Sequence, residues 1–123
     1  TLSAKRLSRY GVIIDAIFGI GLEREVRSPY REIIEAVNTS GVPVVAIDIP
    51  SGLDAATGRA RSVSGVPNEA SGLGAAIKAK VTVTMAVPKK AFRNRLSRAY
   101  TGRVVIADIG IPAKAITLAR LTH

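Results

Sequence analysis

The sequence predicts an α/β fold with a mostly parallel sheet, because four short apolar runs alternate with helical or turn-rich segments. The runs occupy residues 11–18, 43–49, 80–87 and 102–111. They are rich in valine and isoleucine, as expected of strands buried on both faces. A helical pattern follows the first run. It completes a strand–helix–strand unit, whose right-handed crossover makes its strands parallel.

The segment SPYREIIEAVNTSG, residues 28–41, has the start and stop signals of a helix. Ser28 is a suitable N-cap, Pro29 suits the first helical position and Glu32 suits the first turn. The apolar positions 33, 34 and 37 form a stripe along one side. Gly41 is expected to end the helix, because glycine readily adopts the left-handed conformation that follows a last turn.

Glycine and proline recur through residues 50–74, which we expect to form a loop. A short helix over residues 69–79 is predicted, although its two glycines disfavour it. Residues 89–100 are predicted to form a short helix or an irregular turn. Pro112 ends the last strand, and the tail after it, residues 113–123, is weakly amphipathic.

The composition indicates a folded domain without disulfides. The 123 residues amount to one domain or part of one, and 47% of them are hydrophobic, which is enough for a packed core. Cysteine is absent, so disulfides and thiolate metal sites are excluded. No apolar run approaches the roughly 20 residues that span a bilayer, and the basic start lacks a secretory signal's apolar segment. We therefore expect a cytoplasmic protein with no membrane partner.

The net charge of +9 favours anionic partners. We interpret the densest basic cluster as a solvated face rather than a specific anion site. Two phenylalanines, three tyrosines and no tryptophan are present, so no base-stacking platform is indicated and nucleic acid is not the expected partner. The basic cluster comprises Lys89, Lys90, Arg93, Arg95 and Arg98.

Polar residues gather where the predicted strands end. In open parallel sheets, ligands bind outside the carboxyl ends of the strands. Residues close to these ends are therefore expected on the edge of the sheet that faces a ligand. In chain order they are Asp15, Asp48, Ser51, Lys89 and Asp108.

The glycines of FGIGL follow the first strand. Gly19 and Gly21 allow a tight turn and a close approach of backbone to a ligand phosphate. Arg24 stands where a dinucleotide fingerprint would have its third glycine, so the spacing alone favours an ordinary turn. Arg24 and Arg27 could neutralise a phosphate, although solvated arginines are commoner.

The segment DIPSGLD, residues 48–54, combines a sharp turn with polar side chains. Gly52 would aim the Ser51 hydroxyl and the Asp48 carboxylate toward one space. For Asp54 we favour an Asx turn that satisfies backbone groups. A serine nucleophile is not expected, because no Gly-x-Ser-x-Gly elbow is present and the single histidine is the terminal residue.

Asp15 and Asp48 both need a partner, because burying a carboxylate at the end of an apolar strand costs free energy unless the group is paired or coordinated. Two carboxylates and a hydroxyl on adjacent strand ends could hold a hard cation through oxygen ligands. Hydrogen bonds from loop amides could equally satisfy them. The residues alone leave both alternatives open.

Four blocks of the sequence resemble the YjeF N-terminal domain, the NAD(P)H-hydrate epimerase family. They are VIIDAIFGIGLEREV, VVAIDIPSGLDAATG, AAIKAKVTVTMAVPKKAF and GRVVIADIGIP, in the family's order. The resemblance covers roughly residues 11–112, and the second block is specific. We expect residues 1–123 to form the C-terminal portion of such a domain.

The resemblance implies a three-layer α/β/α, Rossmann-like fold that lacks its N-terminal part. It also implies a repair reaction that interconverts the R and S epimers of hydrated NADH or NADPH, so that a dehydratase, fused or separate, can restore the cofactor. A bound potassium ion is implied as well. A homodimer is left open.

The resemblance assigns roles by motif position. Asp15 and Ser51 are expected to be potassium ligands, and Asp48 a substrate-binding acid. Asp48 is also the expected catalytic residue, since a partly desolvated carboxylate can exchange a proton near neutral pH. The expected loop over the substrate's phosphates comprises Gly19, Ile20, Gly21, Leu22, Glu23, Arg24 and Glu25.

The chain also departs from the family pattern. The family's Asn-Asn-Gly-Gly-Asp loop is absent, and the resemblance places it upstream of residue 1. Lys80 stands where many members have aspartate, Ala56 replaces an acid and Ala91 stands where glycine is common. The charge and the missing loop favour an alternative, a non-catalytic YjeF-type module that binds nucleotides or RNA. The retained site residues favour the epimerase.

Overall fold

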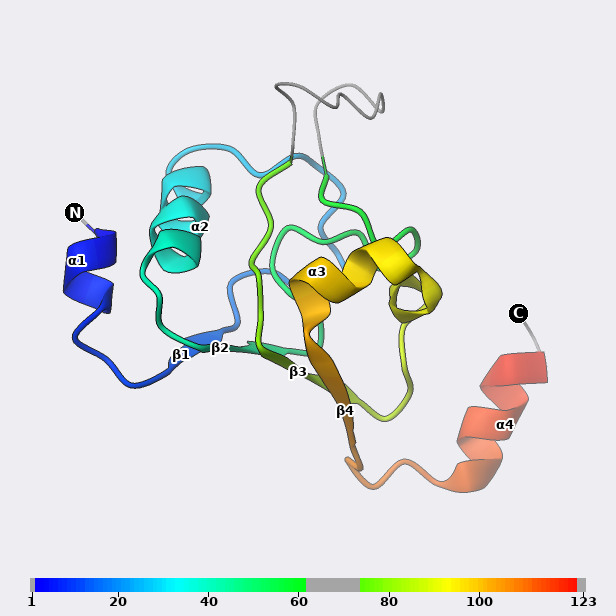
Figure 1. Cartoon of the computed structure of the whole chain (residues 1–123). Coiled ribbons are helices and arrows are strands. Elements are labelled where there is room, and N and C mark those ends of the chain that lie inside the picture. Colours follow the sequence, from blue (N-terminus) through cyan, green and yellow to red (C-terminus); the bar gives the residue numbers. More distant parts are fainter. Residues whose placement is uncertain (1, 62–73, 122–123) are drawn as a thin grey trace.

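The structure is a computed structural model that describes residues 2–61 and 74–121 (Figure 1). Within them a sheet is formed by β1 (Ile13–Asp15), β2 (Val44–Ile47), β3 (Val81–Met85) and β4 (Arg103–Ala107). The strands lie in the order β1-β2-β3-β4, and all neighbouring pairs are parallel. The predicted parallel α/β sheet is therefore confirmed, with strands shorter than the apolar runs.

The helices are α1 (Ala4–Leu7), α2 (Tyr30–Thr39), α3 (Arg98–Thr101) and α4 (Ala113–Leu121), with 3-10 turns at Lys90–Arg93 and Arg95–Ser97. Figure 1 shows α2 and α3 on the same side of the sheet, and α4 beyond the end of β4. Each new strand is added at the same edge of the sheet, in the order β1-β2-β3-β4. Right-handed crossovers in such an order all lie on one face of the sheet. In the described part of the chain, no helix is long and apolar enough to cross a membrane.

The two faces of the sheet differ in burial. Asp15 is aligned with Ala46, which in turn is aligned with Thr82, and all three are buried. On the opposite face, Ile14 is 58% exposed and Val105 is 38% exposed. The described residues thus show the sheet and one of the two helical layers that the resemblance implies.

The core lies between α2 and the sheet. Ile34 and Val37, from the predicted apolar stripe, pack in one cluster with Val44, Ala46 and Ile77. Complete burial of an isoleucine stabilises a fold by about 1.5–3 kcal/mol. This packing fixes the position of β2, and therefore of the polar turn that follows it.

The start of α2 differs from the expectation. The prediction that Ser28 is the N-cap is wrong, because Pro29 has helical backbone angles and occupies the cap position without a side-chain cap bond. The Ser28 hydroxyl instead donates a hydrogen bond to Glu32. The expected end is confirmed: Ser40 is the C-cap, and Gly41 follows with φ of +73°.

The helix predicted over residues 69–79 is wrong for residues 74–79, which form no regular element. Long-range partners hold this part of the chain. Ile77 N donates to Ser51 O at 2.8 Å, and Asn38 binds the backbone on both sides of Ile77, at Ala76 O and Lys78 N. A backbone bonded to distant partners cannot make helical bonds. The remainder of the prediction lies outside the described residues.

Candidate functional site

A buried polar cluster joins the end of β1 to the turn after β2. Ser51 N donates to Asp15 Oδ2 at 2.8 Å, and Ser51 Oγ donates to Asp15 Oδ1 at 2.6 Å. The Ser51 hydroxyl also accepts a hydrogen bond from Phe18 N at 2.9 Å, and it lies 3.3 Å from Phe18 O. Asp15 is 2% exposed and Ser51 1%. The sequence prediction that strand ends bring these two residues together is confirmed.

The Asp15 carboxylate has hydrogen-bond donors but no counter-ion among residues 2–61 and 74–121. Its contacts are the two from Ser51 and a longer one of 3.4 Å from Ile17 N. No lysine or arginine of the described chain forms an ion pair with it. A buried carboxylate in such a position gains from a cation placed against it.

A second polar cluster surrounds Asp48, the residue directly after β2. Three donors contact the same oxygen, Oδ1: Lys89 Nζ at 2.8 Å, Met85 N at 3.0 Å and Thr84 Oγ1 at 3.1 Å. The side chain of Asp48 remains 23% exposed and that of Lys89 17% exposed. Asp48 is thus held firmly and still reaches solvent.

The backbone at Asp48 is strained. Its φ is +68°, in the left-handed region that side-chain-bearing residues rarely adopt. Ile49 N donates to Ile47 O at 2.8 Å across it, so Asp48 is the centre of a three-residue turn. Asp48 N itself donates to Val83 O at 2.7 Å on β3. Strain of this kind is typical of positions where a side chain is aimed for function.

Burial raises the pKa of Asp48, but the hydrogen bond from Lys89, the backbone N–H of Met85 and the charge of Lys89 outweigh it, so the pKa lies below its ordinary value of 3.8. The sequence argument expected a desolvated acid that exchanges its proton near neutral pH. The structure corrects that reason, because Asp48 is an ionised hydrogen-bond acceptor there.

The turn after β2 also differs in one respect from its prediction. Gly52 makes the expected sharp turn with φ of +90°, and a Cβ added there would lie 2.0 Å from Ala75 O. The Ser51 hydroxyl and the Asp48 carboxylate, however, bind different partners. The Ser51 hydroxyl donates to Asp15, and the Asp48 carboxylate pairs with Lys89. The two acids therefore lie in separate clusters at the ends of neighbouring strands.

The loop predicted to bind phosphates, residues 19–25, is mostly exposed. A Cβ added at Gly19 or Gly21 would meet no atom within 4 Å, and neither glycine has a positive φ. The turn expected here is present at Ile20–Gly21, but it has open space around both glycines and needs no positive φ. Apart from the turn at Ile20–Gly21, no backbone N–H group of residues 19–25 donates a hydrogen bond to another described residue. These groups are available to an anion.

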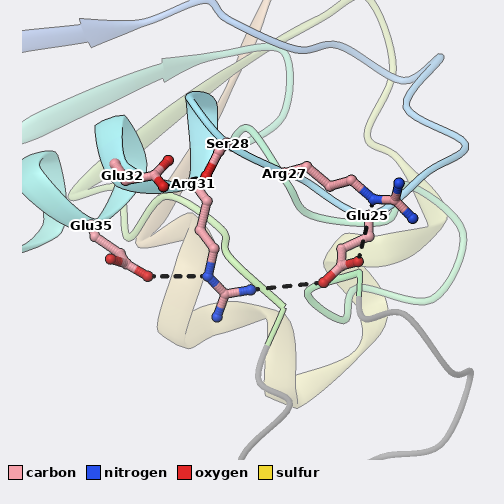
Figure 2. Close-up of polar contacts among 6 residues, drawn as sticks. All are labelled: Glu25, Arg27, Ser28, Arg31, Glu32 and Glu35. Carbon is pink, nitrogen blue, oxygen red and sulfur yellow. Dashed lines mark hydrogen bonds and ion pairs between the residues drawn. The ribbon is translucent and has the colours of Figure 1, made fainter.

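Charged side chains organise the end of this loop (Figure 2). Glu25 lies between two arginines, with Arg27 Nε at 3.9 Å and Arg31 Nη1 at 3.7 Å, and Arg31 also pairs with Glu35 at 3.2 Å. These arginines offset the negative charge of Glu25. Arg24 is exposed and forms no ion pair in the part of the chain that is described. Glu23, the residue before Arg24, is likewise exposed and without an ion pair in the described chain, so an anion at the loop would meet one unpaired arginine and one unpaired carboxylate.

Arg61 is a residue that the sequence argument missed. Its Nη2 pairs with Asp54 Oδ2 at 2.5 Å, and its Nη1 donates to Glu23 O at 3.0 Å. Arg61 thus ties the turn after β2 to the loop at residues 19–25. Its Nε is buried and has no hydrogen-bond partner among the described residues. No local pattern marks Arg61 as a link between the two segments, because Glu23 lies 38 residues away in sequence.

The remaining candidates have local roles. The Asx turn expected at Asp54 is confirmed, since Oδ1 accepts hydrogen bonds from Ala56 N at 2.9 Å and Thr57 N at 2.7 Å. Burial raises the pKa of Asp54, but these bonds and the charge of Arg61 bring it below its ordinary value. Asp108 follows β4 at the expected edge, is exposed, and accepts a hydrogen bond from Gly110 N at 2.8 Å.

Comparison with known proteins gives a consistent result. A family model described as YjeF-related protein N-terminus matches residues 1–91. An NAD(P)H-hydrate epimerase of Limosilactobacillus fermentum is 41% identical over 97 residues, which are 79% of this chain and 41% of that protein. A bifunctional NAD(P)H-hydrate repair enzyme Nnr of Coxiella burnetii is 35% identical over 100 residues, 81% of this chain and 18% of that protein. The chain therefore spans less than half the length of these relatives.

The fold is similar to that in a crystal structure of yeast ynu0, YNL200c. The TM-score is 0.59 at 24% sequence identity, and the match covers 85% of this chain and 38% of that chain. This likeness bears on the arrangement of strands and helices alone.

Proposed function

Because the chain belongs to the family of YjeF-related protein N-termini, we propose that it carries the substrate edge of an NAD(P)H-hydrate epimerase. The reaction interconverts the R and S epimers of hydrated NADH or NADPH. The names of the two curated relatives support hydrated NAD(P)H as the substrate class.

One observation carries the proposal most directly. The partly exposed carboxylate of Asp48 lies at the carboxyl end of β2, and the loop with free amide groups follows the carboxyl end of the neighbouring β1. A dinucleotide needs both features, since its phosphates take N–H donors and its hydroxyl groups take a carboxylate acceptor. Ligands bind at this edge in open α/β sheets.

The chain's own residues would share the work. Residues 19–25, with Arg24, would hold the phosphates, while Glu25 is compensated by Arg27 and Arg31. Asp48 would accept a hydrogen bond from a substrate hydroxyl. It would take up that proton while a bond at the hydrated carbon opens, and return it when the bond re-forms on the other face. Because its pKa is lowered, Asp48 is ionised at neutral pH and free to take up a proton, which so weak a base returns readily.

The cluster around Asp15 fits a potassium ion. Its potential ligands are the Asp15 carboxylate, the Ser51 hydroxyl and the carbonyl of Phe18, all oxygen atoms that suit a hard cation. The single negative charge of Asp15, buried without a counter-ion in the described chain, matches a monovalent ion. When bound, the ion would supply a fixed positive charge beneath the loop. Asp15 and Ser51 are the residues that we assign to hold it.

A second candidate function has one observation in its favour. Lys90, Arg93, Arg95 and Arg98 are exposed, and none forms an ion pair within the described ranges. A non-catalytic module that binds RNA or nucleotides would use such a surface. A mobility shift with single-stranded RNA that weakens steeply with salt would support this candidate.

Further expectations remain predictions. The bifunctional repair enzyme of Coxiella burnetii supports a second repair activity that acts with the epimerase, and we propose a dehydratase, fused or separate. We also propose a cytoplasmic location and a homodimer. We propose in addition that residues 1–123 form part of one domain.

The function is tested by following the exchange between epimers of hydrated NADPH by chromatography. One epimer is purified, the protein is added, and the appearance of the other is timed in potassium and in choline chloride of equal ionic strength. We expect faster exchange with the protein, and more so with potassium. Exchange no faster than in buffer would reject the epimerase function.

A further inference from the structure

Lys89 forms an ion pair with Asp48 through one of the two carboxylate oxygens, Oδ1. Its Nζ shares the oxygen Oδ1 with Met85 N and Thr84 Oγ1. Three donors at 2.8, 3.0 and 3.1 Å therefore converge on one atom. This leaves little room for a ligand at Oδ1.

The other oxygen, Oδ2, has no partner in the described part of the chain. Among the described residues, the buried side-chain polar atom without a hydrogen-bond partner is Arg61 Nε. Oδ2 of Asp48 also lacks a partner, so it is not a buried atom. A carboxylate oxygen can accept two hydrogen bonds. Oδ2 is therefore open toward solvent, at the edge of the sheet where ligands bind.

The backbone supports the same arrangement on both strands. Asp48 has φ of +68° directly after β2, and Ala86 has φ of +57° directly after β3. A short bond crosses each residue, from Ile49 N to Ile47 O and from Val87 N to Met85 O. Both strands thus end in the same rare turn, one presenting Asp48 and the other starting the segment that brings back Lys89.

We propose that Lys89 is a positioning residue for the reaction, which fixes Oδ1 of Asp48 and so presents Oδ2 to a hydroxyl group of the nucleotide substrate. This inference rests on the proposed epimerase function and deepens it. An ammonium has three donors, and the contact with Asp48 uses one. The partial exposure of Lys89 leaves the other two able to face a ligand oxygen.

The test uses Lys89→Met, which keeps an apolar stem and removes the charge, and Lys89→Arg, which restores a charge. Lys90→Met is the matched control, because Lys90 is the next residue, is exposed and has no ion pair in the described chain. Thermal unfolding shows whether each variant is folded. The readouts are the Asp48 carboxyl titration by carbon NMR and the pH profile of kcat/KM for epimer exchange.

We expect Lys89→Met to move the Asp48 titration and the acid limb of the profile to higher pH and to slow exchange at least tenfold at its optimum. Lys89→Arg should recover much of the rate, and Lys90→Met should behave as the unmodified protein. A purely structural role would lower the unfolding temperature and leave the acid limb in place.

Two results separate this inference from the function on which it rests. If the protein accelerates exchange but Lys89→Met leaves the Asp48 titration and the acid limb unchanged, the role of Lys89 is overturned and the function stands. If the protein gives no exchange while Lys89→Met still shifts the Asp48 titration, the epimerase function fails. Lys89 then positions Asp48 for some other ligand.

Discussion

Ser51 donates two hydrogen bonds to Asp15, one from its backbone nitrogen to Oδ2 at 2.8 Å and one from its hydroxyl to Oδ1 at 2.6 Å. This pairing joins the end of one parallel strand to the turn after the next, 36 residues along the chain. It places a buried carboxylate close to Phe18, the residue before the loop at residues 19–25, since Phe18 N donates to the same hydroxyl.

Replacing Ser51 by alanine should destabilise the fold by about 1–3 kcal/mol, because it leaves a buried carboxylate oxygen and the Phe18 N–H short of a partner. Urea unfolding followed by circular dichroism measures the change. Ser8→Ala is the control, since its hydroxyl makes an exposed local bond to Lys5 O, and it should stay within about 0.5 kcal/mol. Equal stability of the two variants would contradict the role given to the Asp15–Ser51 pair.

Potassium should stabilise the protein through Asp15. A ligand that binds only the folded state raises the free energy of unfolding as its concentration rises. We expect the unfolding temperature to rise in potassium chloride more than in choline chloride of equal ionic strength, and Asp15→Asn to remove the difference. An identical response of wild type and Asp15→Asn would argue against a cation at this carboxylate.

Replacement by alanine should affect stability at Gly52 and substrate binding at Gly19. Gly52→Ala places a Cβ 2.0 Å from Ala75 O at a φ of +90°, so we expect a loss of more than about 3 kcal/mol or no folded protein. Gly19→Ala meets nothing within 4 Å and should preserve stability while weakening the binding of hydrated NADPH. Calorimetry of unfolding and of binding distinguishes these effects. Unchanged affinity in Gly19→Ala would remove the loop from the site.

Stability should fall in acid partly through Asp48 and Asp54. Both carboxyls have a pKa below the ordinary value of 3.8 in the folded protein. Each therefore stabilises the fold fully above its unfolded pKa, and this contribution is lost as pH falls through the lower, folded pKa. We expect the free energy of unfolding to drop from about pH 5 to pH 2.

The same dependence can be assigned to residues by substitution. Asp48→Asn and Asp54→Asn should each make the acid-side slope of stability against pH shallower than in the unmodified protein. Equilibrium unfolding in urea at a series of pH values measures the slopes. Slopes that stay unchanged in both variants would show that neither carboxylate is held in its ionised form by the fold.

Much of this arrangement could be predicted from local sequence. The four apolar runs gave the strands, and the strand-end rule placed Asp15, Asp48 and Ser51 at one edge. The contact between Asp15 and Ser51 follows from parallel neighbouring strands. Glycine also correctly predicted the end of the helix at Gly41 and the sharp turn at Gly52, where the backbone has a positive φ.

Other features depend on partners that are distant in the sequence. The failed helix at residues 74–79 is held by Ser51 and Asn38, neither of which a local pattern reveals. Ser28 is a good cap by residue type, yet its hydroxyl is used by Glu32. The short helix α1 was not expected, and its Ser3 cap gives a weak signal at the chain start.

The chemistry of Asp48 shows the same limit most clearly. Its position suggested a desolvated acid, but the sign of its pKa shift is set by Lys89, Met85 and Thr84, which are 36 to 41 residues away by number. These donors share one oxygen of a residue whose backbone forms a strained turn, and neither feature is visible in the local sequence. The sequence predicted the residue, and the structure shows the donors that lower its pKa.

The most direct measurement is the rate at which one purified epimer of hydrated NADPH converts to the other, compared between the unmodified protein and Asp48→Asn in the same potassium buffer. Asp108→Asn, a carboxylate at the same edge with a local hydrogen bond, is the control. We expect Asp48→Asn to slow exchange by about 10²–10⁴-fold and Asp108→Asn to keep the full rate. An Asp48→Asn protein as fast as the unmodified one would contradict the assignment of this edge as the epimerase site.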